Sequence, residues 1–166
     1  DSPEELGEFE EVEADQLPPN YRQLLAHHSH MTVTLEEFHR SMVDVRVLDS
    51  ITSNSHYSRT IVLHRKSDSK AVQYGIVRLH RSFLEDEVFE EIVEQREPLG
   101  RILIRHNVLR QVKLLSLWNV ELGPALKSAM DRSELEICYG RTALIYCNGL
   151  PAVELLEIVV ADDDEA

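Results

Sequence analysis

The end of the sequence contains the feature that most constrains the fold. Residues 142–147 and 150–160 are two apolar-rich runs on either side of the dipeptide Asn148-Gly149. Both turn residues tolerate positive φ angles, and this dipeptide between such runs is the strongest short signal for a β-hairpin. We therefore expect an antiparallel sheet that contains this hairpin.

Residue periodicity predicts the other elements. Three valines alternate with charged residues over 43–47, which indicates a half-buried strand, and residues 59–64, 71–80 and 108–117 are predicted to form further strands. Helices are predicted at 21–26, 83–94 and 122–130, and a capping box at Thr34 and Glu37 predicts one that buries Leu35, Phe38 and Met42. Residues 97–100 are predicted to form a turn. The pattern is typical of an α+β domain with one antiparallel sheet of about six strands and helices packed on one face.

Composition indicates one domain between two acidic ends. The 166 residues are 43% hydrophobic, enough for a single core. We expect residues 1–16 to be a flexible acidic tail, residues 17–160 to form the domain, and residues 161–166 to be a second acidic tail. The formal net charge of −13 argues against nucleic acid and anionic membrane surfaces as partners.

The sequence also suggests a cytoplasmic location. It contains no apolar run long enough for a membrane span and no basic-then-apolar signal peptide. Cys138 and Cys147 are too few for a disulfide framework, which suits a reducing compartment. We expect two buried thiols, with a cross-strand disulfide as the alternative.

Candidate site residues come from charges on apolar strand faces. Arg59 shares a face with Ile61 and Leu63, where a guanidinium is costly unless it meets an anion. That anion could be an internal carboxylate, which the residues alone favour, or a ligand carboxylate held by a bidentate clamp. Glu154 and Glu157 lie on opposite faces of the last strand, and alternation does not choose between them.

A histidine cluster stands before the second predicted helix. His27, His28 and His30 have no Cys or acidic partner at a spacing that is typical of a zinc site. We therefore expect a solvated helix end there and no metal.

Seven short segments, in this order and spacing, carry a resemblance to a known family. They are His30-Met31-Thr32, Arg59-Thr60-Ile61-Val62-Leu63, Tyr74-Gly75, Pro98-Leu99-Gly100, Tyr139-Gly140-Arg141-Thr142, Asn148-Gly149-Leu150-Pro151 and Glu157-Ile158-Val159. On these segments the chain resembles the chorismate–pyruvate lyase family and its divergent lyase-like relatives. The resemblance covers all but the acidic ends.

The resemblance implies a ligand enclosed in an internal cavity and a role for each matching residue. Arg59 binds the ring carboxylate and Glu157 meets the ring hydroxyl, while Leu99 and Gly100 contribute backbone contacts. The segment Met31-Thr32 lines the pocket. The implied reaction converts chorismate to 4-hydroxybenzoate, or a related hydroxybenzoate, and pyruvate, with no cofactor or metal. Aromatisation drives it, so the protein mainly positions the substrate and manages one proton, and apolar surroundings that keep Glu157 protonated suit a general acid.

Two departures from the family pattern widen the set of candidates. Ile76 stands where characterised members have an arginine, and Arg78 on the same strand face is the substitute. The final glutamate is one residue further from Pro151 than in those members, which makes Glu154 the fallback acid. The alternatives to the lyase are a non-catalytic binder of aromatic acids, since the same fold serves as an effector-sensing domain in some bacterial regulators, and a lyase-like protein with another aromatic or enolpyruvyl substrate.

Overall fold

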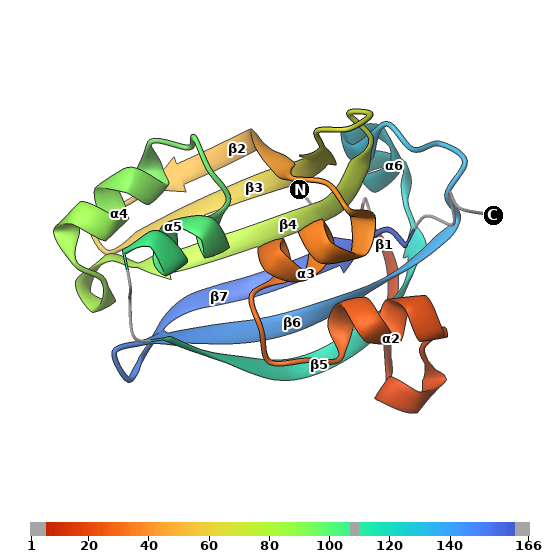
Figure 1. The fold of residues 1–166 in the computed structure, drawn as a ribbon, viewed down its shortest axis with the longest axis horizontal. Helices are drawn as coiled ribbons and strands as arrows, with labels where there is room; N and C mark the ends of the chain where they lie inside the picture. The colour runs from red at the N-terminus through yellow and green to blue at the C-terminus, as the bar shows by residue number, and fades with distance from the viewer. Residues whose placement is uncertain (1–5, 107–109, 162–166) are drawn as a thin grey trace.

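A computed structural model describes residues 6–106 and 110–161. Its centre is one antiparallel sheet of seven strands in the order β1-β5-β6-β7-β4-β3-β2 (Figure 1). The strands are β1 (Gly7–Val12), β2 (Val43–Thr52), β3 (His56–Arg65), β4 (Ala71–His80), β5 (Arg110–Leu122), β6 (Ile137–Cys147) and β7 (Leu150–Val159). The α+β class and the single antiparallel sheet predicted from the sequence are confirmed.

The hairpin predicted at residues 142–160 is the centre of this sheet. Asn148 and Gly149 have φ angles of 52° and 83°, as a turn of this kind requires. β6 and β7 pair directly, and β7 also pairs with β4. The clearest signal in the sequence therefore marks the strand pair around which the other strands are arranged.

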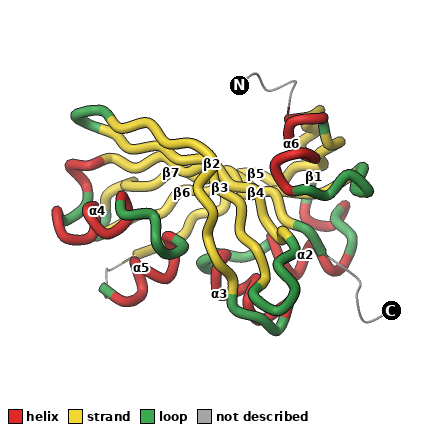
Figure 2. Tube along the Cα trace, turned by 90° about the horizontal axis from the view of Figure 1, so that it is seen from above, coloured by secondary structure: helices red, strands yellow, loops and turns green. Residues whose placement is uncertain are grey.

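Helices cover the two faces of the sheet unequally. In the described residues α2 (Pro19–Leu25), α3 (Met31–His39), α4 (Asp86–Val93) and α5 (Leu99–Arg105) lie on one face, which we call the inner face (Figure 2). α6 (Pro124–Met130) packs on the opposite, outer face, where Leu126 and Met130 join a cluster with Val62 and Ile158. Two short 3-10 segments, Ala14–Gln16 and Arg81–Phe83, complete the elements. The predicted one-sided packing thus holds for four helices and not for α6.

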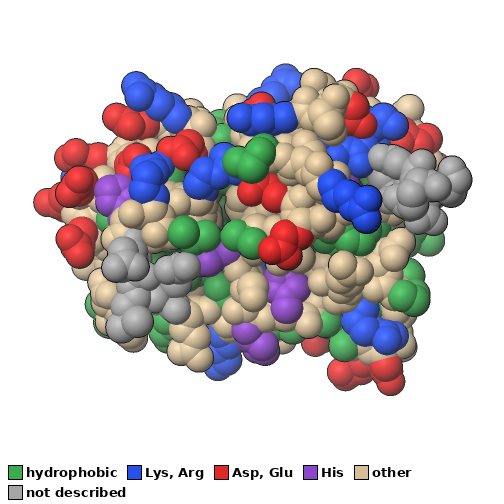
Figure 3. All heavy atoms as spheres, viewed as in Figure 1, with side chains coloured by type: hydrophobic (Ala, Val, Ile, Leu, Met, Phe, Trp, Pro, Cys, Tyr) green, Lys and Arg blue, Asp and Glu red, His purple; other side chains and the backbone are tan. Residues whose placement is uncertain are grey.

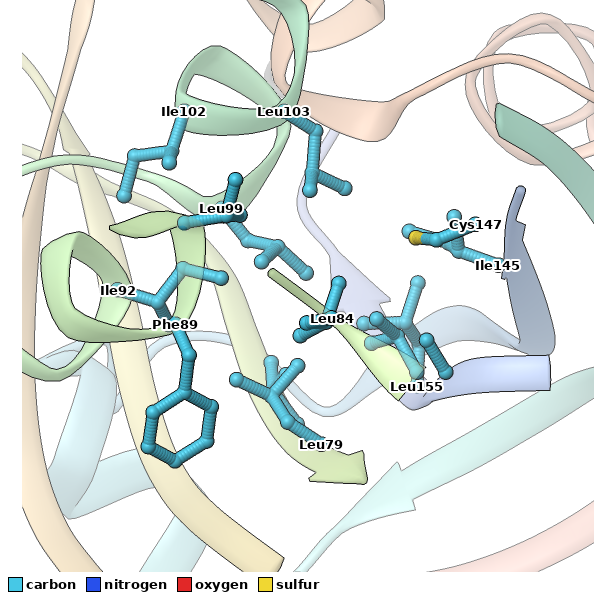
Figure 4. Close-up of a cluster of buried hydrophobic side chains, with 14 of the residues drawn as sticks. Leu79, Leu84, Phe89, Ile92, Leu99, Ile102, Leu103, Ile145, Cys147 and Leu155 are labelled. Atoms are coloured by element: carbon cyan, nitrogen blue, oxygen red, sulfur yellow. The ribbon is translucent and has the colours of Figure 1, made fainter. Parts of the chain in front are cut away.

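The sheet and helices on the inner face share a core of aliphatic side chains. Figure 4 shows Phe89 and Ile92 of α4 and Ile102 of α5 in one cluster with Leu79 and Leu155 of the strands. Burial of each such side chain contributes roughly 1.5–3 kcal/mol. The opposite side of α4 is acidic, and its glutamates gather at one end of the molecule in Figure 3. This two-sided pattern fixes which face of α4 meets the sheet.

The structure corrects three expectations about the elements. Residues 7–12 were assigned to a flexible tail, but they form β1 and pair with β5. α3 begins at Met31, and the Thr34 hydroxyl inside it donates to the His30 carbonyl (3.3 Å), so the predicted capping box is wrong and Met42 lies beyond the helix, 49% exposed. The segment predicted to be a turn at 97–100 instead opens α5. Residues 1–5 and 162–166 of the acidic ends lie outside the described residues.

The length and composition of the helices can be compared with those of a membrane span. Within residues 6–106 and 110–161, none is long and apolar enough to cross a bilayer.

Candidate functional site

A small pocket lies between the inner face of the sheet and the beginnings of α3 and α5. Its walls include Met31 and Thr32 of α3, Leu99 and Gly100 of α5, and Val77 of β4. The free volume is about 30 Å³, room for a few water molecules at most. Pockets that hold small organic ligands measure about 300–1,000 Å³. This pocket, as it stands, is therefore too small for an aromatic acid.

Glycine at position 100 allows α3 and α5 to meet at this pocket. A side chain there would place its Cβ 3.1 Å from the Thr32 hydroxyl oxygen and 3.3 Å from the His30 Cβ. Contacts this short would require the Thr32 or His30 side chain to move by a few tenths of an ångström, so glycine suits the close approach of the two helix ends. Met31, Thr32, Leu99 and Gly100, which the resemblance assigned to substrate binding, are thus brought together.

The floor of the pocket is a buried ion pair. Arg141 of β6 and Glu157 of β7 face each other in register, and the Arg141 Nε donates to Glu157 Oε1 at 2.8 Å. The same guanidinium donates to the carbonyls of His27 and Ser29, each at 3.0 Å. Glu157 therefore has a cation beside it rather than the apolar surroundings expected for a general acid.

Arg141 was not singled out in the sequence, although a signal existed. It shares its strand face with Ala143 and Ile145, both of them buried. The same alternation that drew attention to Arg59 would have placed Arg141 in the core. Sequence reasoning therefore found one half of the ion pair, Glu157, and missed the other.

Gln73 of β4 adds a polar group to the same floor. Its side chain is 3% exposed and lines the pocket, and its Oε1 atom has no hydrogen-bond partner among the described residues. Its Nε2 lies 3.2 Å from where a Cβ of Gly75 would be, so the missing side chain at 75 leaves room for the amide. Gly75 in turn pairs with Glu157 across β4 and β7. An unpaired buried acceptor costs about 1–3 kcal/mol, which a donor on a bound molecule would offset.

The loop before α3 places two histidines near the floor. His30 is buried and lines the pocket, so the solvated helix end expected there is wrong for this residue. His27 lies beside the Arg141 guanidinium, and its Nε2 lies 2.6 Å from the Leu24 carbonyl. Burial and the Arg141 charge lower the pKa of His27, which keeps the imidazole neutral at pH 7. No group of three metal-ligating side chains is present in residues 6–106 and 110–161.

Arg59 is buried next to the pocket but does not line it. Its side chain is 1% exposed, and it donates to the carbonyls of Ile92 (3.2 Å) and Glu97 (3.4 Å), at the end of α4 and before α5. Its Nε has no partner, and no carboxylate pairs with it in the part of the chain that the structure describes. Burial lowers the pKa of this guanidinium, which stays protonated near neutral pH. The internal ion pair considered for Arg59 is therefore not found there.

Arg78 and Glu154 lie elsewhere. They come from the outer face of the sheet, both largely exposed, and they pair with each other at 3.7 Å. Neither lines the pocket. The structure thus separates these two fallback candidates from Arg59 and Glu157, and any contribution by them to a ligand site would have to lie on the other side of the sheet.

Comparison with known proteins gives a likeness of fold. No family model and no curated protein matches the chain. Among solved structures, YydK from Bacillus subtilis, described as a possible transcriptional regulator, superimposes with a TM-score of 0.55 at 13% identity, covering 76% of this chain and 59% of that one. The ligand-binding domain of a protein assigned to the GntR family of regulators, from Bordetella bronchiseptica, gives 0.51 at 12% identity, covering 72% and 86%.

The chain shares its fold with these regulator domains. At such low identity the likeness extends to the fold and no further. The chain also spans only 59% of the YydK structure, so the activity of that whole protein does not carry over. The resemblance to the chorismate–pyruvate lyase family and the lyase activity that it implies stay predictions.

Proposed function

We propose that the chain binds a small aromatic carboxylate between α3, α5 and the sheet, with its carboxylate at Arg59. The observation that carries this proposal is a guanidinium held away from water without a carboxylate partner. Taking a cation out of water costs several kcal/mol unless an anion accompanies it. Two carbonyls, one of them at 3.4 Å, and the side chain of Tyr57 are weak compensation, because none of them is an anion at neutral pH. A bidentate carboxylate matches the geometry of the guanidinium better.

The position of Arg59 connects it to the pocket. Three residues next to Arg59 line the pocket. They are Ile61, two residues further along β3, Val77, which pairs with Arg59 on β4, and Pro98, which follows the Glu97 carbonyl that accepts from Arg59. A small outward movement of the segment before α5 would therefore join the guanidinium to the free volume. We propose that the ligand carboxylate replaces the Glu97 carbonyl and also accepts from the Arg59 Nε.

The opposite end of the pocket suits the rest of such a ligand. Met31, Leu99 and Leu155 provide apolar walls for a ring. Gln73 Oε1 is an acceptor without a donor. Glu157 is close to it, because Glu157 pairs across the strands with Gly75, two residues from Gln73. A ring hydroxyl would satisfy that acceptor. Apolar walls with a few convergent polar groups are typical of small-molecule sites, and the small free volume means that binding must move α5 or the side chains at its start.

Calorimetric titration with 4-hydroxybenzoate tests the proposal. Arg59→Met keeps most of the side-chain volume and removes the charge. Since charged hydrogen bonds contribute about 1.5–3 kcal/mol, we expect the affinity to fall about 10- to 150-fold. Arg78→Met makes the same chemical change on the outer face and should bind like the wild type. Wild-type protein that binds no hydroxybenzoate, or Arg59→Met protein that binds unimpaired, would refute the proposal.

The lyase reaction is the second candidate, because Glu157 lines the pocket in which we propose that the aromatic acid binds. Incubation with chorismate, with pyruvate and 4-hydroxybenzoate as readouts, separates the two functions. Product formation that Glu157→Gln abolishes would identify a lyase. Binding without product identifies a binding domain, and turnover of another enolpyruvyl acid would identify a lyase with an altered substrate.

A further inference from the structure

Two histidines face each other across neighbouring strands at one end of the sheet. His56 is the first residue of β3 and His80 is the last of β4, and the two pair directly in the strand register. The hydrogen bond next to them runs from the Arg81 N–H to the Ser55 carbonyl (2.9 Å), so the histidines themselves are a non-hydrogen-bonded pair. In such pairs the Cα atoms are about 4.5 Å apart, and the side chains lie closer than elsewhere in an antiparallel ladder. The backbone therefore brings the two imidazoles together.

The distance between the two rings matches what one metal ion needs. His56 Nε2 and His80 Nε2 are 3.4 Å apart, and the ring centroids are 4.1 Å apart. Imidazole nitrogens bind zinc at about 2.0–2.1 Å, so two nitrogens with this spacing would meet a shared ion at an angle of about 110°, close to that of a tetrahedral site. An N–H···N hydrogen bond of 3.4 Å is long, so direct contact between the rings stabilises the pair little.

We propose that His56 and His80 bind one zinc ion through their Nε2 atoms, and that the ion connects β3 to β4. Zinc prefers a tetrahedral site and accepts imidazole nitrogens together with water oxygens, which would fill the remaining positions. Two protein ligands are fewer than the three or four of catalytic and structural zinc sites, so we expect reversible binding. Such a site is compatible with the lack of any group of three metal-ligating side chains in residues 6–106 and 110–161.

Neighbouring groups hold both rings in an orientation that leaves Nε2 available. Ser55 Oγ lies 2.7 Å from His56 Nδ1. When Nδ1–H donates to this hydroxyl, the Nε2 atom has a lone pair to give to the ion, and histidines that bind metals almost always donate their other N–H in this way. His80 stacks on the ring of Phe83, with centroids 4.9 Å apart and an interplanar angle of 21°. Ser55 is therefore a positioning residue for the proposed site.

The charges around the pair also bear on metal binding. Glu154 Oε2 lies 3.9 Å from His80 Nε2 and supplies a negative charge, whereas Arg78 lies 3.7 Å from the same carboxylate oxygen and opposes a cation. The side chains of His80 and Glu154 are 31% and 47% exposed, so an ion reaches them from solvent. Loss of surrounding water and the charge of Arg78 lower the pKa of His56, with a smaller contribution from His80. Glu154 acts in the opposite direction, and the net effect leaves the His56 imidazole without a competing proton at pH 7.

Calorimetric titration of tag-free protein with zinc chloride at pH 7.5 tests the site. The wild type should bind Zn²⁺ below about 1 mM. His56→Gln and His80→Gln should each weaken binding at least about tenfold, because loss of even an outer-shell partner typically costs about 10–100-fold. Ser55→Ala keeps both ligands and should weaken binding about tenfold. His64→Gln is the matched control, since His64 lies on the same strand opposite Ala71 and should be dispensable.

Nitrogen-15 spectra of the imidazoles provide a second test that does not depend on a substitution. The chain has eight histidines, and the Nε2 resonances of His56 and His80 should shift together as zinc is added. Circular dichroism establishes that the variants are folded. Urea denaturation should show a zinc-dependent rise in the midpoint for the wild type that His56→Gln removes, because the unfolded chain does not hold the two rings together. A wild type without a zinc site, zinc affinity that survives both histidine substitutions, or shifts confined to other histidines would each overturn the proposal.

Discussion

The ion pair on the pocket floor makes a quantitative prediction about stability. Arg141 is fully buried and Glu157 is 7% exposed, so Arg141→Met would leave a carboxylate inside the protein without its cation. Breaking a buried pair in this way typically costs about 3–5 kcal/mol. The substitution also removes the donors to the His27 and Ser29 carbonyls. Against a total stability of about 5–15 kcal/mol for a domain, the loss should be large.

Replacing both partners separates the cost of an unpaired buried carboxylate from the cost of the lost hydrogen bonds. Arg141→Met combined with Glu157→Leu leaves neither charge of this pair in the core, and its remaining cost is the two bonds to carbonyls, about 1–3 kcal/mol together. We therefore expect the double variant to be more stable than Arg141→Met alone. Urea unfolding followed by circular dichroism gives the free energies for this double-mutant cycle. Arg141→Met that costs less than about 1 kcal/mol, or additive effects of the two substitutions, would refute the reasoning.

Three further outcomes can be measured on the same pocket. Gln73→Leu removes the unpaired acceptor, so calorimetry should show that the variant no longer prefers 4-hydroxybenzoate over benzoate; a preference equal to that of the wild type would contradict the assigned contact. Gly100→Val would push against Thr32, 3.1 Å from the new Cβ, and should lower stability by about 1–3 kcal/mol in urea unfolding, with Ser29→Val as an exposed control. The lowered pKa of His27 means that the unfolded chain binds more protons near its ordinary pKa of 6.5, so stability should fall as the pH drops through that value. His27→Gln should reduce this dependence in denaturation midpoints measured across that range, and an unchanged pH profile would show that another group is responsible.

Local signals in the sequence were sufficient for most strands. The hairpin at Asn148-Gly149 was predictable because its turn chemistry lies within two residues. β1 was not, because Phe9 and Val12 are surrounded by glutamates and become half-buried only when β5 pairs with them. Phe9 then meets Trp118 with ring centroids 6.3 Å apart. Such a pairing across more than a hundred residues has no signature in the segment itself.

The candidate site was predictable in its residue types more than in its contacts. Leu99 and Gly100 were expected near a ligand, but a helix that follows Pro98 and contains a glycine resembles a turn in sequence. Arg59 and Glu157 were both predicted to be site residues. Which of them would be paired inside the protein depends on Arg141, a residue on a different strand, and on the carbonyls at the end of α4. Both sets of contacts join segments that are far apart in the sequence, so they follow from tertiary structure alone.

The place of β7 in the sheet has a consequence for the order in which the chain folds. The strands β2, β3 and β4 form one group and β1, β5 and β6 another, and within the sheet only β7, the last strand in chain order, is hydrogen-bonded to both. A nascent chain can assemble each group as it is synthesised. The two groups cannot join into one sheet until residues 150–159 have left the ribosome, and until then the edges of β4 and β6 stay open to incorrect partners.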